Sequence, residues 1–289
     1  MANLKEIRNR ISSVGSTMQI TSAMKMVSAA KLKKAQDAIV AMRPYAETLS
    51  ALLQNLSAAL DGEANSPYTA QRPVKKVLAV VITSNRGLAG AFNSNVVKEA
   101  IAVTEHYADA EVDFMTLGKK GNDAFDKSGK VIYNNNAIFD DLNFESNATI
   151  AEQLMDKFTT GAYDKIVLIY NKFKNAATQI VMNENFLPLE PQAHENGDSG
   201  SSNTDFIFEP SQEEIVAELI PKSLKTQLFK AMRDSVASEH GARMTAMHKA
   251  TDNAKELKDS LTLEYNKARQ AAITNEILES VGGAEALAG

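Results

Sequence analysis

The chain has 289 residues, no cysteine and a formal net charge of −5 at pH 7. Without cysteine it can form no disulfide, no thiolate metal site and no cysteine nucleophile. Its longest apolar run, VLAVVI at 77–82, is too short to cross a bilayer, so any membrane association is expected to be peripheral.

The first 60 residues carry a heptad repeat. Steps of alternately three and four residues from Leu4 to Leu60 meet apolar side chains at all but three positions. A seam of this length is typical of a long coiled-coil helix. Pro44 lacks a backbone donor, so we expect a kink or break near Arg43. The segment holds 8 Lys/Arg against 3 Asp/Glu, which favours an acidic protein partner or a solvated face over nucleic acid.

The three polar seam positions are consecutive. In this stretch, ITSAMKMVSAAK, the apolar residues stand one position earlier than the seam requires. We therefore expect the seam to slip by one residue, which packs poorly against a heptad partner. Flexible methionine suits a contact that must repack, and the alternative is a local irregularity of the coil. The polar seam positions are Thr21, Lys25 and Ser28, and the apolar residues before them are Ile20, Met24 and Val27.

A second long helix is expected over roughly 211–281, where no proline follows Pro221. Apolar residues keep the three–four spacing there, from Met247 to Leu261. Both helices attach by their inner ends to the same middle segment, so they must run antiparallel. From Ala268 onward the helix is small and apolar nearly all round, so another structure should enclose it.

The middle segment alternates strands and helices joined by short links. This alternation indicates a Rossmann-like α/β domain with a substantially parallel sheet, so the whole is a mixed fold of an antiparallel two-helix coil and an α/β domain. The domains are expected at 1–60, 74–208 and 209–289. The strands are expected at 75–83, 111–118, 130–133, 165–173 and 179–190, and the helices at 94–107 and 148–161.

The chemistry-bearing motifs are weak. The turn TSNRGLAGAFN (83–93) follows a buried strand, where α/β folds bind phosphates, but its glycines lack nucleotide-binding spacing and more simply let the turn close. The four histidines have no ligand spacing, and no catalytic set is present. We therefore expect no catalytic residue, no metal and no cofactor. An α/β enzyme that uses this turn on a phosphorylated substrate remains an alternative.

Three stretches together resemble the gamma subunits of F-type ATP synthases. They are the N-terminal MANLKEIRNRISSVGSTMQITSAMKMVSAAKLKKAQ, the turn TSNRGLAGAFN, and RMTAMHKATDNAKELKDSLTLEYNKARQAAITNEILESVGGAEAL. The resemblance implies a non-catalytic central rotary shaft that couples proton flow through a membrane c-ring to the cycling of catalytic beta subunits. A freestanding coiled-coil scaffold with an α/β head is the other alternative.

The resemblance also implies partners and contact residues. The coil would stand inside a ring of alpha and beta subunits, one copy per complex, with the epsilon subunit and c-ring at its foot and no nucleic acid. A start at Met1 without a presequence fits a bacterial protein, peripheral on the cytoplasmic face of the inner membrane. The residues matched to beta-subunit contacts are Met24, Lys25, Arg243, Arg269, Gln270, Thr274 and Glu276, and those matched to the c-ring and epsilon foot are Phe206, Phe208 and Glu209.

Overall fold

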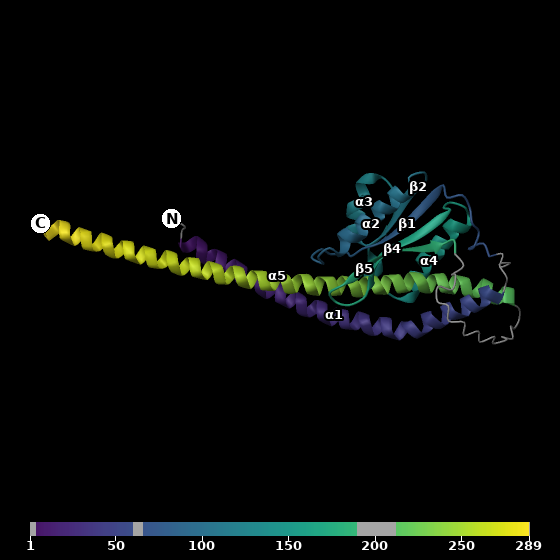
Figure 1. The fold of residues 1–289 in the computed structure, drawn as a ribbon, viewed down its shortest axis with the longest axis horizontal. Coiled ribbons are helices and arrows are strands. Elements are labelled where there is room, and N and C mark those ends of the chain that lie inside the picture. Colours follow the sequence, from purple (N-terminus) through teal and green to yellow (C-terminus); the bar gives the residue numbers. More distant parts are fainter. Residues whose placement is uncertain (1–3, 60–65, 190–211, 289) are drawn as a thin grey trace. The chain divides into compact units, whose positions relative to one another are not determined.

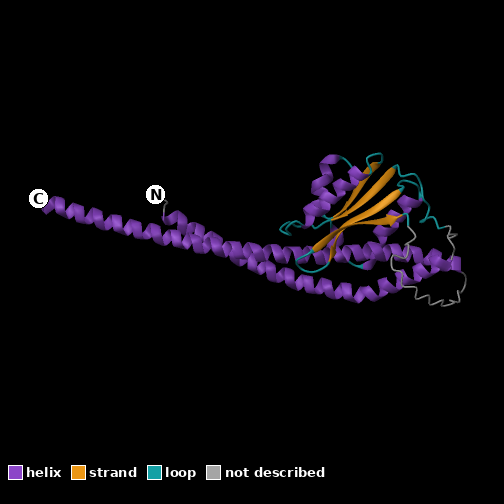
Figure 2. Cartoon of the chain, in the orientation of Figure 1, coloured by secondary structure: helices purple, strands orange, loops and turns teal. Residues whose placement is uncertain are grey.

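The computed structural model describes residues 4–59, 66–189 and 212–288. Two helices, α1 (Leu4–Ala59) and α5 (Gln212–Ala288), come from the two ends of the chain. The elements between them alternate strand and helix, as expected (Figures 1 and 2). They are β1 (Lys76–Ile82), α2 (Phe92–His106), β2 (Glu111–Leu117), α3 (Lys119–Phe125), β3 (Val131–Asn135), α4 (Phe144–Thr159), β4 (Lys165–Phe173) and β5 (Gln179–Leu187), with 3-10 turns at Asp126–Ser128 and Ala137–Phe139.

The chain forms two compact units. One unit combines residues 1–29 with 243–289, and the other contains residues 30–242. The two long helices pass from one unit into the other, and α1 is helical through Pro44 without a break. The first unit is a two-helix coil, and the second is an α/β domain that includes the first part of α5. The predicted fold class is confirmed.

The α/β domain is built on a five-stranded sheet in the order β3-β2-β1-β4-β5. Its first four strands are parallel, and β5 is antiparallel to β4. The central strand β1 explains the layering, because successive side chains of a strand point to opposite faces. Residues 78, 80 and 82 join a core with α4 and α5, whereas 77, 79 and 81 join a core with α2.

The first part of α5 is a core helix of this domain. Leu224, Leu228 and Met232 are fully buried beside α4 and the sheet. Their spacing of four residues places them along one stripe of the helix. The sequence indicated only a coiled-coil helix over this range, because a helix facing a sheet and a helix facing another helix show the same period.

In the coil unit, α1 and α5 run antiparallel (Figure 1). Arg8 contacts Tyr265 and Thr21 contacts Thr251, so a later residue of α1 meets an earlier residue of α5. The antiparallel prediction is therefore confirmed.

The expected slip of the seam is wrong. Thr21 and Lys25 are half-buried and Ser28 is 3% exposed, whereas Ile20 and Val27 are 61% and 57% exposed. The seam continues in its original register because its hydroxyls bond to carbonyls of their own helix: the Thr21 hydroxyl donates to Thr17 O (3.0 Å) and the Ser28 hydroxyl to Met24 O (2.8 Å). A buried hydroxyl satisfied in this way needs no water.

The turn between β2 and α3 requires glycine at position 118, and this requirement can be tested by substitution. Gly118 has φ +114°, and a Cβ there would lie 2.2 Å from the backbone oxygen of Thr83. We expect Gly118→Ala to lower the free energy of unfolding by more than about 3 kcal/mol, from strain and overpacking together. Gly129 also has a positive φ but nothing within 4 Å, so Gly129→Ala is the control and should cost only about 1 kcal/mol. Urea unfolding of the purified variants measures both, and equal losses would contradict this explanation.

Candidate partner-binding surfaces of the coil

Polar pairs fix the alignment of α1 and α5 in the coil unit. The Arg8 guanidinium donates to the Tyr265 hydroxyl at 2.6 Å and also lies over its ring. The Thr251 hydroxyl lies 2.8 Å from the Thr21 hydroxyl and bonds in turn to Met247 O. Because each hydroxyl has a fixed place on its helix, these pairs specify one axial register, as polar seam residues do in other coils.

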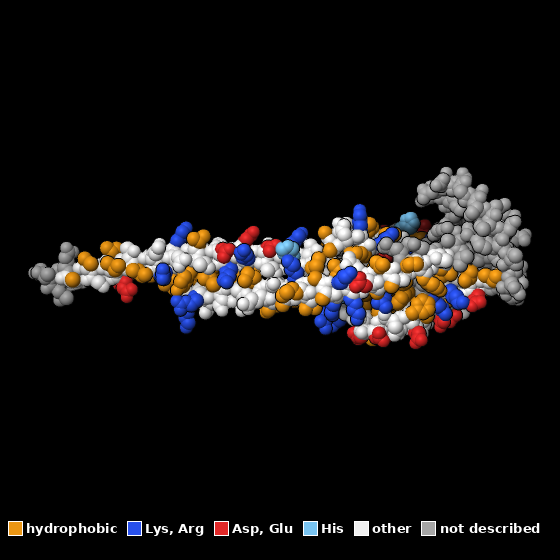
Figure 3. Space-filling model, turned by 90° about the horizontal axis from the view of Figure 1, so that it is seen from below, with side chains coloured by type: hydrophobic (Ala, Val, Ile, Leu, Met, Phe, Trp, Pro, Cys, Tyr) orange, Lys and Arg blue, Asp and Glu red, His pale blue; other side chains and the backbone are white. Residues whose placement is uncertain are grey.

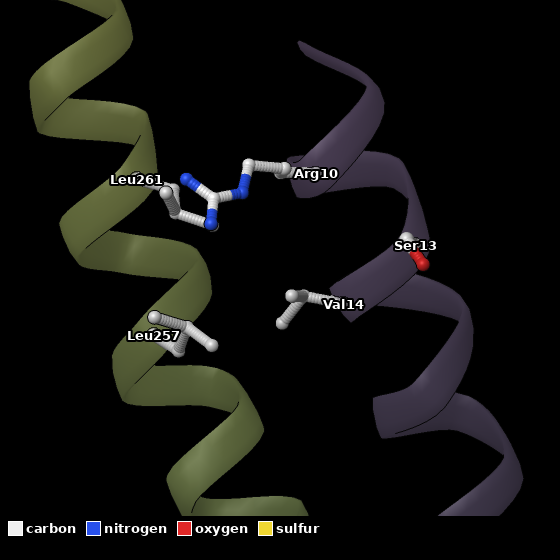
Figure 4. A pocket seen from close by; sticks show the side chains of 5 residues that line it. All are labelled: Arg10, Ser13, Val14, Leu257 and Leu261. Carbon is white, nitrogen blue, oxygen red and sulfur yellow. The ribbon is translucent and has the colours of Figure 1, made fainter. Parts of the chain in front are cut away.

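A shallow groove of about 230 Å³ lies between the two pairs. Arg10 and Val14 of α1 face Leu257 and Leu261 of α5 across it, with Ser13 at its edge (Figure 4). Leu261 is buried but Leu257 is about half exposed. The heptad pattern alone did not show that the seam is open here, because it indicates which residues face the partner helix and not how closely they pack.

The structure separates Met24 and Lys25 from the fully exposed face of their helix. Both are half-buried at the margin of the seam. The outer face carries Ile20, Met26 and Val27 instead, which are all more than half exposed. Sequence reasoning expected Met26 near the surface but missed Ile20 and Val27 as surface residues, because the expected slip placed these two against α5.

The tip of α5 is exposed on every side. All described residues from 269 to 284 are exposed, including the predicted contacts Arg269, Gln270, Thr274 and Glu276. In the same stretch Ile273, Ile277, Leu278 and Val281 expose about half of their surface. Figure 1 shows that α5 continues past the start of α1, and Figure 3 shows hydrophobic side chains and few charges at this end. Such a helix lacks a partner within the described chain.

The remaining predicted contacts fall in different places. Arg243 is 8% exposed, so its side chain is enclosed and does not lie on the free surface. Phe206, Phe208 and Glu209 lie outside the described residues. The structure therefore brings Arg269, Gln270, Thr274 and Glu276 together at the tip and places Met24, Lys25 and Arg243 elsewhere.

The turn after β1 lies at the switch point of the sheet, where the strand order reverses between β1 and β4. Doubly wound domains commonly bind ligands at this edge. Here Ala89 and Phe92 of the turn pack against Ala242 of α5. The side chain of Asn85 bridges the neighbouring loops, since its amide donates to Asn136 O and its oxygen accepts from the Lys119 backbone. Helix and loop contacts therefore occupy this part of the edge.

Across the described part of the chain, no group of His, Asp and Glu side chains is placed to hold a metal ion. Within the same residues, no helix is both long and apolar enough to span a bilayer.

The fold and these surfaces define a protein made of a two-helix coil, whose tip exposes apolar side chains, and a Rossmann-like domain. The chain matches the ATP synthase family over residues 3–287. It is 71% identical to the ATP synthase gamma chain of Flavobacterium johnsoniae, over all of both chains. The chain therefore belongs to the ATP synthase family, among its gamma chains, which are non-catalytic rotor subunits of the central stalk.

Solved structures agree with this assignment. One is the central stalk/c-ring of Tetrahymena thermophila mitochondrial ATP synthase, at 27% identity and a TM-score of 0.61, with 80% of this chain and 99% of that chain covered. The rotor of Euglena gracilis mitochondrial ATP synthase is 22% identical with a TM-score of 0.66, over 93% and 98% of the two chains, and supports the fold.

The register of the coil can be tested by crosslinking, because the chain has no cysteine of its own. The hydroxyls of Thr21 and Thr251 are 2.8 Å apart, so cysteines at these positions should form a disulfide on oxidation. Cysteines at Ile20 and Thr251 are the control and should not, because Ile20 points away from the seam. Mobility on a non-reducing gel measures the crosslink. A stronger crosslink between positions 20 and 251 than between 21 and 251 would show that the seam is slipped by one residue after all.

Proposed function

We propose that this chain is the rotating shaft that couples proton flow through a membrane ring of c subunits to ATP synthesis and hydrolysis by beta subunits. The observation that carries the proposal is the tip of α5, which is exposed on all sides from 269 to 284 and carries four large apolar side chains, Ile273, Ile277, Leu278 and Val281. Apolar side chains exposed to water are unfavourable, and a ring that encloses the helix would bury them. A ring of alternating alpha and beta subunits supplies such an enclosure.

The transmission step would involve the side of α1 near Met24. An asymmetric shaft that turns inside the ring presents this side to each beta subunit in succession, and so favours binding, synthesis and release in turn. The outer residues Ile20, Met26 and Val27 supply apolar contact area, and Lys25 supplies a cation at the edge of the seam for an acidic beta segment. Arg243, which is enclosed, would support this region from within.

The foot of the shaft would contact the c-ring and the epsilon subunit through Phe206, Phe208 and Glu209. The family membership of the chain supports this, as does its likeness to the central stalk/c-ring structure of the Tetrahymena ATP synthase. We propose that each complex contains one copy of the chain and that the complex places it at the cytoplasmic face of a bacterial inner membrane, as a peripheral subunit. Copurification tests it directly: alpha and beta subunits should accompany a tagged chain in excess over it, together with epsilon, and a stable homodimer without them would favour a freestanding scaffold.

The coupling role of the Met24 segment predicts an unequal effect of added charge. Met24→Lys adds a second cation beside Lys25, so the segment should hold the acidic beta segment too strongly in one position. Proton-driven ATP synthesis should then fall more than ATP hydrolysis. Ser12→Lys, an exposed position three turns earlier on the same helix, is the matched control and should change neither. Both rates are measured in membrane vesicles, and an equal loss of the two would contradict a coupling role.

The enclosed tip predicts a variant that binds poorly although it folds normally. Ile277 is 57% exposed in the free chain, so Ile277→Asn should change the free energy of unfolding by no more than about 0.5 kcal/mol. Burial of the isoleucine in a ring would contribute about 1.5–3 kcal/mol, so the variant should bind the alpha–beta ring correspondingly less tightly. Thr262→Asn, also exposed on α5, is the control. Unchanged binding by Ile277→Asn would remove the tip from the interface.

A further inference from the structure

Hydrogen bonds join the first part of α5 to the α/β domain at several levels along the helix. At Lys225, the carbonyl accepts from the Asn147 amide at 3.0 Å and the ammonium donates to Glu152 Oε1 at 2.6 Å. The Gln227 amide donates to Glu184 Oε1 at 2.7 Å and to Asn185 O at 3.1 Å. Arg233 donates to Leu142 O at 2.7 Å. The Ser238 hydroxyl donates to Asn171 O at 2.9 Å. All of these contacts lie within the 30–242 unit.

These contacts approach the helix from different sides. At about 100° per residue, Gln227 and Ser238 lie nearly on one line along α5, and Arg233 lies roughly 120° away from it. The first pair meets strands β4 and β5, whereas Arg233 meets the segment before α4. A helix bonded from one side can still roll on that contact. Bonds from two sides oppose rotation about the helix axis.

The partners on the domain side are themselves held. Glu184 accepts a second hydrogen bond from the Tyr170 hydroxyl at 2.7 Å. The Asn171 amide donates to Phe92 O at 3.0 Å, which extends the Ser238 contact across β4 to the start of α2. Ser238 and Asn171 are at most 1% exposed, so water cannot replace these bonds.

Close packing completes the attachment at the end of this helical segment. A Cβ on Gly241 would lie 3.2 Å from both the Cα and the carbonyl oxygen of Ala176, in the turn between β4 and β5. The next residue, Ala242, packs with Ala89 and Phe92 of the turn after β1. The small side chains bring the α5 backbone against the sheet edge, so that the helix cannot turn without displacing backbone atoms.

We propose that Gln227, Arg233 and Ser238 form a torque clamp that fixes α5 rotationally to the α/β domain. The inference rests on the proposed function, in which torque enters at the foot and leaves through the coil. A covalent connection at one end of a helix transmits position but leaves the helix free to twist about its axis. The core packing of Leu224, Leu228 and Met232 already opposes that rotation, and the clamp residues add directional bonds that hold α5 in one rotational position. They act by positioning α5.

The clamp is tested in the whole ATP synthase complex with the triple variant Gln227→Met, Arg233→Met and Ser238→Ala, which removes the donors and nearly keeps their volume. Loss of each bond should raise the population of slipped shafts by about fivefold. ATP-driven proton pumping per ATP hydrolysed should therefore fall severalfold, while hydrolysis itself persists. Thr226→Val is the matched control, because among the described residues this buried hydroxyl bonds to Lys222 O of its own helix and to no other element. A triple variant as tightly coupled as the control would overturn the proposal.

A second measurement separates slipping from poor folding. With the c-ring crosslinked to the stationary membrane subunits, hydrolysis by the unaltered complex should stop, and hydrolysis by the triple variant should continue. If hydrolysis stops in both complexes, the clamp proposal is wrong, whereas the proposed function as a rotating shaft still stands. If both continue, the proposed rotation is wrong. Should the triple variant fail to assemble, Ser238→Ala alone is measured with the same expectation, and normal coupling there counts against the clamp.

A disulfide supplies a rescue that a merely destabilised domain would not show. Ala89 and Ala242 belong to one small packed cluster of the domain, and the chain has no other cysteine. Ala89→Cys and Ala242→Cys in the triple variant should restore pumping when oxidised and lose it again when reduced. An oxidised, crosslinked complex that stays uncoupled would show that rotation of α5 against the domain is not the cause.

Discussion

The structure depends on one helix that meets three environments without interruption. In the α/β domain α5 is a core element, with Leu224 and Leu228 fully buried. In the coil it buries only a seam, at Met247, Ala254 and Leu261, which recur every seven residues. Beyond Ala268 every described residue up to 284 is exposed. Because a helix is stiff along its hydrogen-bonded backbone, these environments are linked mechanically even where their side chains share no contact.

The polar stretch of the seam shows how packing and exposure are balanced on α1. Thr21 and Ser28 at the seam positions bond to carbonyls of their own helix, and Thr21 also meets the Thr251 hydroxyl of α5, so their hydroxyls can be buried in the seam. This leaves the apolar residues Ile20 and Val27 on the outside, where the coil gains nothing from them. Their apolar area is therefore available to another protein. The interruption of the heptad pattern therefore lowers the apolar packing between the two helices, and it provides an outward-facing apolar contact surface.

Most of the helices and strands could be predicted from the periodicity of apolar residues. Which element packs against each apolar face could not. The continuous apolar run of β1 indicated a buried strand, and the heptads of α1 indicated a coil. Periodicity counts apolar side chains along one element, however, and does not say what covers them. For this reason the whole of α5 was expected to be a coiled-coil helix although Leu224 packs in the core of the α/β domain, and Ile20 was expected in the seam although it faces solvent. The enclosure of Arg243 has the same origin, since its burial depends on residues distant in the sequence.

The sheet edge after β1 explains how a ligand-binding architecture can serve a mechanical part. In doubly wound domains this edge is usually open, because the loops there diverge at the switch point. Here α5 runs close by it, and Gly241 and Ala242 are small enough to let the helix backbone approach the turns after β4 and β1. The buried chain from Ser238 through Asn171 to Phe92 then supplies polar contacts of the kind that a bound ligand would otherwise make. An edge suited to orienting a ligand is equally suited to orienting a helix, because both uses need fixed donors and acceptors in a closely packed site. The same geometry that would place a substrate for reaction holds a shaft in one rotational position.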